Sequence, residues 1–487
     1  MDDRRPLLER TAALAADFID GLPDRRVGST ADIAELRASL GGPIPDGPSE
    51  PMEVVEAMAR AADPGLVATP GPRYFGFVVG GSLPAALAAD WLTSAWDQNT
   101  GLYVLSPAAA VAEEVAASWL LDVFGLPEGS SVGFTTGATM ASFTAIAAAR
   151  HRVLERAGWN VETDGYVGAP PIAVVVSDES HVTIFVSLQM LGLGRERVHR
   201  VPTDDQGRMR ADALRETLAH LDGPIIVCAQ SGNVNTGGFD PLPDIVAAVR
   251  EKPNAWLHVD GAFGLWAAAV PELRSLVAGV ADADSWTTDA HKWLNVPYDS
   301  GIVVVRDAAA HHASMTLGAS YYVETAGGER DNYNWVPESS RRARGFTVYA
   351  ALQSLGRSGL AEMVGRCCTL AQRMADRLAE SPGVVVLNDV VLNQVLVRFV
   401  PPGVPEEAAS GPDTAVDDHT RRIIAAVQAD GTCWLGGTTW HGMAAMRISV
   451  SNWSTTEADA DLSVEAILRC AREVADQVAG GASVSTA

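Results

Sequence analysis

Lysine is almost absent from this chain. Of its 36 basic residues only Lys252 and Lys292 are lysines, and arginine takes the other positions. A reaction that needs a primary amine therefore has two candidate side chains. Basic charge as a whole is also scarce. The formal net charge of −24 argues against binding to nucleic acid or to an anionic membrane, because both need a basic face.

Cysteines and long apolar runs are few as well. The five cysteines are odd in number and show no paired ligand spacing, which argues against a disulfide framework or a metal site and fits a reducing compartment. Charged residues interrupt the apolar runs before the roughly 18 residues that a membrane span needs. The charged residues 1–5 do not resemble a secretory signal. We therefore expect a cytoplasmic protein with no metal, nucleic-acid or membrane partner.

The chain itself is long and globular in composition. Its 487 residues, 47% of them hydrophobic, are enough for two or three folding units. From about residue 131, short β-branched runs alternate with helical patterns, which predicts a mainly parallel sheet covered by helices on both faces. The predicted strands are 171–177, 224–229, 255–259 and 301–305. We expect an N-terminal helical segment (1–80), a large α/β domain (81–355) and a smaller C-terminal α/β domain (356–487).

Lys292 ends a polar segment that lies shortly before the predicted strand 301–305. Most lysines lie at the surface, and we interpret Lys252 in this way. Lys292 differs because Trp293 and Leu294 follow it and predict partial burial, and a partly buried amine is nucleophilic toward aldehydes. Lys292 is therefore the candidate for a Schiff base with an aldehyde cofactor.

Asp260 stands at the carboxyl end of the predicted strand 255–259. A buried carboxylate is costly unless it has a cationic or hydrogen-bonding partner, and parallel sheets bind ligands at this end of their strands. One interpretation is a helix-capping aspartate. The other is the residue that keeps the pyridine nitrogen of pyridoxal phosphate (PLP) protonated, so that the ring can accept electrons. The spacing to Lys292 leaves room for one further strand.

Two other segments are compatible with the same cofactor. Gly137, Ala138 and Thr139 precede a helix predicted over 140–152. Backbone N–H groups at such a position bind phosphate, although the same residue types are common helix caps. His181 follows the strand predicted at 171–177 and is either structural or an imidazole that stacks on the pyridine ring.

Taken together, these segments resemble the group II PLP-dependent amino-acid decarboxylases, which include the aromatic-L-amino-acid, glutamate and histidine decarboxylases. The resemblance rests on 260–263 and 289–293 and extends over most of the chain, with similar segments at 18–27, 73–75, 90–94, 238–241 and 446–452. It implies the aspartate-aminotransferase fold (fold type I), PLP as cofactor, an L-amino acid as substrate, and a homodimer with its sites at the interface.

The resemblance also implies roles for matching residues. The residues that would contact the cofactor are Gly137, Ala138, Thr139, His181, Asn233, Asp260, Ala262, His291 and Lys292. Among them Ala262 would pack under the ring, His181 would stack over it, and His291 would help to bind the phosphate.

On the substrate side, Arg447 would bind the α-carboxylate and Phe75 would belong to an active-site loop. The proton donor to Cα would be a tyrosine, Tyr321 or its neighbour Tyr322, or else His181. Of the two tyrosines we favour Tyr321.

The chain departs from the family pattern at two places in this site. Residues 230–233, Gln-Ser-Gly-Asn, replace a threonine-rich turn, so that Asn233 would take the threonine's place. Asp289 and Ala290 stand where the family has Asn-Pro before His-Lys. A carboxylate beside a phosphate is unfavourable unless it turns away. Both changes lie close to the expected cofactor site and so bear on which product the reaction gives.

Three functions are compatible with the sequence. The main prediction is decarboxylation of an L-amino acid to an amine. The second is other PLP chemistry at Cα, either transamination or oxygen-dependent decarboxylation–deamination to an aldehyde, which product analysis would distinguish. The third is a catalytically silent PLP-fold protein, and the presence of Asp260, His181, Lys292 and Arg447 together weighs against it. The sequence does not identify the amino acid.

Overall fold

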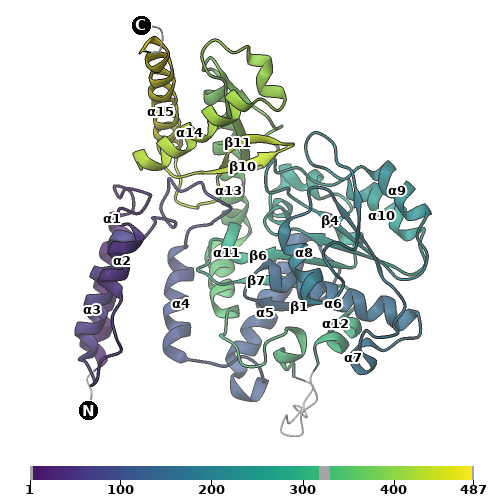
Figure 1. Cartoon of the computed structure of the whole chain (residues 1–487). Coiled ribbons are helices and arrows are strands. Elements are labelled where there is room, and N and C mark those ends of the chain that lie inside the picture. The colour runs from purple at the N-terminus through teal and green to yellow at the C-terminus, as the bar shows by residue number, and fades with distance from the viewer. Residues whose placement is uncertain (1–3, 317–328, 485–487) are drawn as a thin grey trace. The chain divides into compact units, whose positions relative to one another are not determined.

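The computed structural model describes residues 4–316 and 329–484, with side chains up to residue 477. The chain forms two compact units (Figure 1). One contains the residues up to Val79 together with Arg373–Leu387 and the residues from Leu396 onward, and the other contains Gly80–Gln372 and Asn388–Val395. The N-terminal residues thus share a unit with the C-terminal ones. The long helix α13 (Gly345–Ala379) is interrupted by non-helical backbone at Gly356.

The larger unit is built on a seven-stranded sheet with the order β1-β7-β6-β5-β4-β2-β3. Its strands are β1 (Ser131–Thr135), β2 (Ala173–Ser177), β3 (Val198–Val201), β4 (Ile225–Gln230), β5 (Ala255–Asp260), β6 (Ser285–Asp289) and β7 (Gly301–Val305). The neighbours from β3 to β6 pair in parallel, whereas β7 is antiparallel to both β1 and β6. The predicted mainly parallel α/β sheet is therefore confirmed.

Helices pack on this sheet through small and branched side chains. The α-helices of the unit before α13 are α4 (Pro84–Trp96), α5 (Pro107–Phe124), α6 (Ala138–Arg156), α7 (Val161–Asp164), α8 (Val182–Met190), α9 (Ala211–Ala219), α10 (Leu242–Arg250), α11 (Ala290–Trp293) and α12 (Ala308–Met315). Helix α6 contacts β1 and β4–β7. Its buried face is rich in alanine, including Ala141, Ala145 and Ala148. Small side chains let the helix lie close to the sheet. Because α6 directly follows β1, which ends at the same edge of the sheet as β6, it begins near the carboxyl edge.

The smaller unit contains a four-stranded sheet with the order β10-β11-β9-β8. Its strands are β8 (Val384–Val386), β9 (Gln394–Phe399), β10 (Gly436–Trp440) and β11 (Met443–Ser449). Its α-helices are α1 (Arg4–Gly21), α2 (Ile33–Leu40), α3 (Pro51–Ala62), α14 (Thr414–Asp430) and α15 (Glu457–Val484). No helix among the described residues is long and apolar enough to span a membrane.

Candidate active site

The strands of the larger unit bring the predicted cofactor residues to one edge. Asp260 ends β5 and Asp289 ends β6, and these strands are parallel neighbours with Asp260 opposite Thr287. The short helix α11 then presents His291 and Lys292 directly after β6. Residues distant in sequence therefore meet where open α/β sheets bind ligands.

Lys292 lies beside a buried carboxylate. Its side chain is 20% exposed, and its Nζ is 2.9 Å from Oδ2 of Asp289, whose side chain is 3% exposed. The other oxygen of Asp289 accepts a hydrogen bond of 2.6 Å from the backbone N–H of Ala138, the first residue of α6. Nε2 of His291 is 3.6 Å from the same oxygen. The partial burial predicted for Lys292 is thus present, and Asp289 points into this group of donors.

Asp260 is a buried carboxylate with a cationic neighbourhood. It is 5% exposed, and its Oδ1 accepts a hydrogen bond of 3.1 Å from the N–H of Ala262. Burial raises the pKa of Asp260, the charges of His181 and Lys292 act in the opposite direction, and Asp289 adds to the rise. A cation placed against this carboxylate would stabilise its ionised form. A protonated pyridine nitrogen is a cation of this kind, so the site fits PLP.

Two histidines have their ring orientation set by local contacts. Nδ1 of His291 accepts a hydrogen bond of 3.1 Å from the N–H of Ser300. Burial lowers the pKa of His291. A neutral ring that accepts at Nδ1 carries its proton on Nε2, from which it can donate to an anion. His181 caps α8, with its Nδ1 2.8 Å from Oγ1 of Thr183. The His291 ring also lies 4.4 Å from the ring of Tyr298, a neighbour that no sequence pattern had indicated.

Gly137 lies beside the His291 ring, whereas the side-chain oxygen of Asn233 bonds within its own turn. A Cβ added at Gly137 would lie 3.2 Å from Cε1 of His291, so glycine leaves room beside that ring. Asn233 is buried, and its Oδ1 accepts hydrogen bonds from the N–H groups of Asn235 and Thr236. This side-chain oxygen is therefore engaged in its own turn, and a cofactor contact by Asn233 stays a prediction.

The predicted substrate residues that are described lie in the smaller unit. Phe75 is 1% exposed and has almost no surface for a ligand, whereas Phe77 is 61% exposed. The Phe77 ring stacks on Trp434 with centroids 5.8 Å apart, and its carbonyl accepts a hydrogen bond of 3.3 Å from Nη2 of Arg447. The exposed aromatic ring of this loop is therefore that of Phe77. Sequence reasoning missed it, because its unusual backbone (φ +57°) has no marker in the sequence.

Tyr321 and Tyr322 lie outside the described residues. That one of them donates a proton to Cα therefore stays a prediction.

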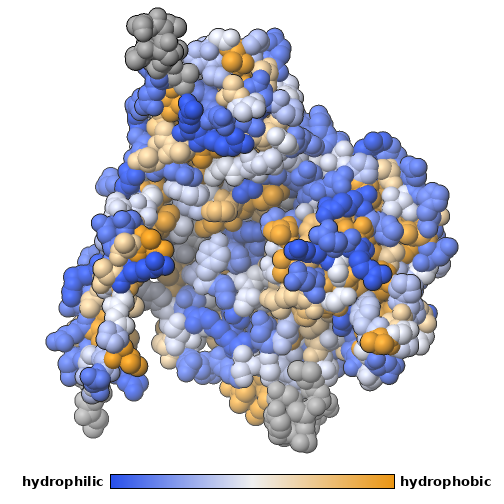
Figure 2. Space-filling view, viewed as in Figure 1, coloured by the Kyte–Doolittle hydropathy of each residue, from blue (hydrophilic) through white to orange (hydrophobic). Residues whose placement is uncertain are grey.

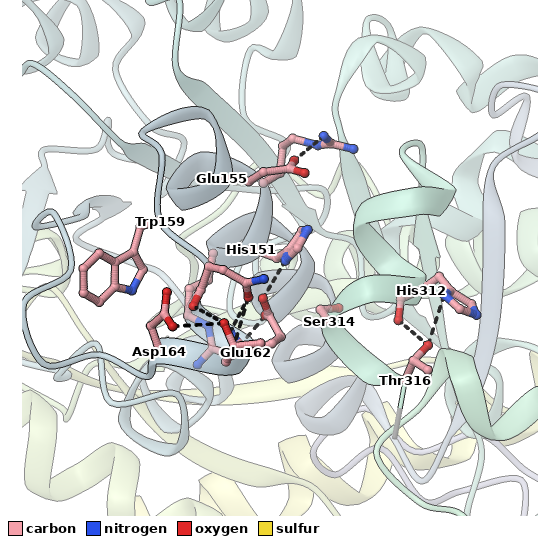
Figure 3. Close-up of polar contacts among 12 residues, drawn as sticks. His151, Glu155, Trp159, Glu162, Asp164, His312, Ser314 and Thr316 are labelled. Carbon is pink, nitrogen blue, oxygen red and sulfur yellow. Dashed lines mark hydrogen bonds and ion pairs between the residues drawn. The ribbon is translucent and has the colours of Figure 1, made fainter. Parts of the chain in front are cut away.

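A second group of histidines and acids lies on the larger unit and has a structural role (Figure 3). Nδ1 of His151, near the end of α6, is 2.6 Å from Oε2 of Glu162 in α7. The side chain of Asn160 caps α7, and Thr316 bonds back to His312 at the end of α12. The first contact joins α6 to α7, and the other two close the ends of single helices. No group of three or more possible metal-ligating side chains was found among the described residues.

The mainly parallel sheet, with a partly buried lysine near buried carboxylates at its carboxyl edge, fits a PLP enzyme of fold type I. A family model described as "Pyridoxal-dependent decarboxylase conserved domain" matches residues 35–400. The chain therefore belongs to this decarboxylase family. It is a PLP-dependent carboxy-lyase that acts on an L-amino acid.

Individual relatives agree with this assignment. The chain is 25% identical over 464 residues to the aromatic-L-amino-acid decarboxylase of Bacillus atrophaeus, which covers 94% of this chain and 93% of the relative. It is 29% identical over 355 residues to the acidic amino acid decarboxylase GADL1 of Mus musculus, covering 71% and 63%. Its fold is similar to that of Oryza sativa TDC, solved with PLP and tryptamine, with a TM-score of 0.89, 23% identity and coverage of 97% and 98%.

Proposed function

We propose that Lys292 is the residue that binds PLP covalently in this decarboxylase. The observation that carries the proposal is the position of its amine at the carboxyl edge of the sheet, 2.9 Å from the Asp289 carboxylate and close enough to Asp260 to oppose the rise in that residue's pKa. The cofactor, when bound, supplies an electron sink for the bond that breaks at Cα. Asp260 holds the pyridine nitrogen in its protonated form.

The remaining cofactor contacts follow from the same edge. His181 would stack over the pyridine ring and Ala262 would pack under it. The backbone at the start of α6, with Ala138 and Thr139, binds the phosphate together with the Nε2–H of His291. Hydrogen-bond donors at a helix N-terminus favour an anion, which supports this assignment.

At the substrate end, Arg447 binds the α-carboxylate and Phe77, rather than Phe75, offers the aromatic ring. This choice is supported by the difference in exposure between the two phenylalanines. Tyr321, in preference to Tyr322, gives Cα its proton after CO₂ has left. The expected product is the amine.

A panel of L-amino acids, with aromatic, acidic and diamino side chains, tests this function. Release of CO₂ would be measured for each, and the product would be analysed for amine, aldehyde and keto acid. We expect CO₂ and amine in equal amounts for one class of side chain. Aldehyde with consumption of oxygen would show the second function instead, and a fully loaded protein that releases no CO₂ from any member would refute decarboxylation.

We also propose that the protein acts as a homodimer in the cytoplasm. Helices α1, α2 and α3 contain no buried residue. Figure 2 shows apolar side chains at the surface of this part of the chain, and those with large exposed fractions include Leu8, Ile33, Leu40, Val54 and Met58. Helices of this kind are stable when their apolar faces are buried against another surface, and a second copy of the chain provides one.

The cytoplasmic location is supported by the five free cysteines, which fit a reducing compartment.

Light scattering combined with activity measurement tests the dimer. Replacing Val54 and Met58, one turn apart on α3, by glutamate should yield a monomer with little activity. Glu53→Gln, at an exposed position of the same helix, is the matched control and should stay dimeric. A parent protein that is monomeric and fully active would contradict the proposal.

A further inference from the structure

Asp289 is held in place on all sides. Its backbone N–H donates to the carbonyl of Ala262 (2.8 Å), and its carbonyl accepts from Nε1 of Trp266 (3.1 Å). As the last residue of β6 it is paired with Gly301 of β7. Its carboxylate is 3% exposed, so little space is open for it to swing toward solvent.

The partners of this carboxylate are the groups that a PLP molecule needs. Oδ1 accepts from the N–H of Ala138 and lies 3.6 Å from His291, both assigned to the phosphate. Oδ2 lies against the amine of Lys292. The chain thus carries an anion of its own between the phosphate-binding donors and the amine that reacts with the aldehyde.

We infer that Asp289 competes with the cofactor for these groups and so lowers the affinity of the protein for PLP. The inference rests on the proposed role of Lys292. Asp289 would then act through the groups that it occupies, and its carboxylate would let bound PLP dissociate more readily.

Two physical effects act in the same direction. A phosphate that binds at the start of α6 brings up to two negative charges close to a buried carboxylate, and repulsion is strong where water is excluded. Covalent attachment also requires a free amine. The nitrogen of Lys292 bonds to the aldehyde carbon. The two protons of the neutral amine leave with the aldehyde oxygen as water. The amine that lies 2.9 Å from the Asp289 carboxylate has to leave it before it can react.

Asp289→Asn tests the inference, because asparagine keeps an oxygen for the N–H of Ala138 and loses the charge. Dissociation constants would be measured by absorbance titration with pyridoxal 5′-phosphate and with pyridoxal, which has no phosphate. We expect the constant for pyridoxal 5′-phosphate to fall by about tenfold or more. The constant for pyridoxal should fall less, because it gains only from the release of Lys292.

The control is Asp212→Asn, which removes the same charge from an exposed ion pair with Arg210 and should change neither constant. Asp289→Ser is a second neutral variant, for use if the asparagine variant melts early. An unchanged or weaker affinity for pyridoxal 5′-phosphate in a folded neutral variant overturns the inference, and so does equal tightening for both ligands. Failure of the proposed function is distinct, because borohydride would then fix no cofactor on Lys292 in the parent protein.

Discussion

Replacing Lys292 by alanine should separate its chemical role from its structural one. The variant loses the amine, so borohydride should fix no cofactor to the protein and the visible absorbance of the bound cofactor should disappear. The variant also leaves Asp289 without its ion-pair partner at 2.9 Å. Both effects are measurable on the same preparation.

The structural cost of this change is modest. Removing one partner of a fully buried ion pair costs about 3–5 kcal/mol. The Lys292 side chain is 20% exposed, and the N–H of Ala138 still donates to Asp289, so we expect about 1–2 kcal/mol. A unit of this size loses about 2–4 °C in Tm per kcal/mol. The variant should therefore stay folded, with a Tm lower by about 2–8 °C when the melt is followed without cofactor.

Lys252→Ala is the matched control, because it removes the only other lysine. Its Nζ donates to the carbonyl of Leu221 after α9, and its loss should change the stability by about 0.5 kcal/mol or less. Peptide mapping after borohydride treatment should find the cofactor on Lys292 in this control. A cofactor found on Lys252, or a Lys292→Ala variant that keeps the visible absorbance, would refute the assignment.

Three further predictions concern the chemistry and the core. Asp260→Asn removes the charge that supports a protonated pyridine nitrogen, so kcat should fall about 10²-fold or more while borohydride still fixes the cofactor; unchanged kcat would remove Asp260 from this role. Tyr321→Phe should lower amine formation about 10²-fold or more and give aldehyde or pyridoxamine phosphate as a side product, whereas Tyr322→Phe should behave like the parent; the reverse result would exchange the two tyrosines. Glu113→Gln removes the counter-charge of Arg341, whose side chain is 2% exposed, and leaves an acceptor for only one of the two hydrogen bonds of 2.8 Å, so unfolding should become easier by about 3–5 kcal/mol; a denaturant midpoint equal to the parent's would contradict it.

Some features of the site required only the sequence. Two lysines in the whole chain reduced the choice of amine to Lys292 or Lys252, and the residues after Lys292 predicted its burial. That Asp260 needs polar or cationic neighbours was predictable, because a charged residue that ends an apolar β-branched run has few stable environments; its role toward the cofactor stays a prediction. The alternation of strands and helices predicted the α/β class for the same kind of reason, since hydrophobic periodicity is a local property.

The antiparallel direction of β7 was not predicted from the sequence, although the short connection before it requires this direction. The connection from β6 to β7 contains only residues 290–300, including the four-residue helix α11. A parallel crossover needs a dozen or more residues, usually with a full helix. β7 therefore returns antiparallel beside β6, and this turn places Lys292 at the carboxyl edge.

Only the tertiary structure decided how the polar side chains are paired. Asp289 and Ala138 are 151 residues apart in the chain. They meet because β1, which leads into α6, lies next to β7, and β7 lies next to β6. Phe75 is buried and Phe77 exposed because backbone hydrogen bonds to Trp434 and Ser449 hold residue 75 inside the smaller unit. Local sequence carries propensity, periodicity and the burial that apolar neighbours indicate, whereas charge pairing and the burial of single loop residues depend on which distant segments pack together.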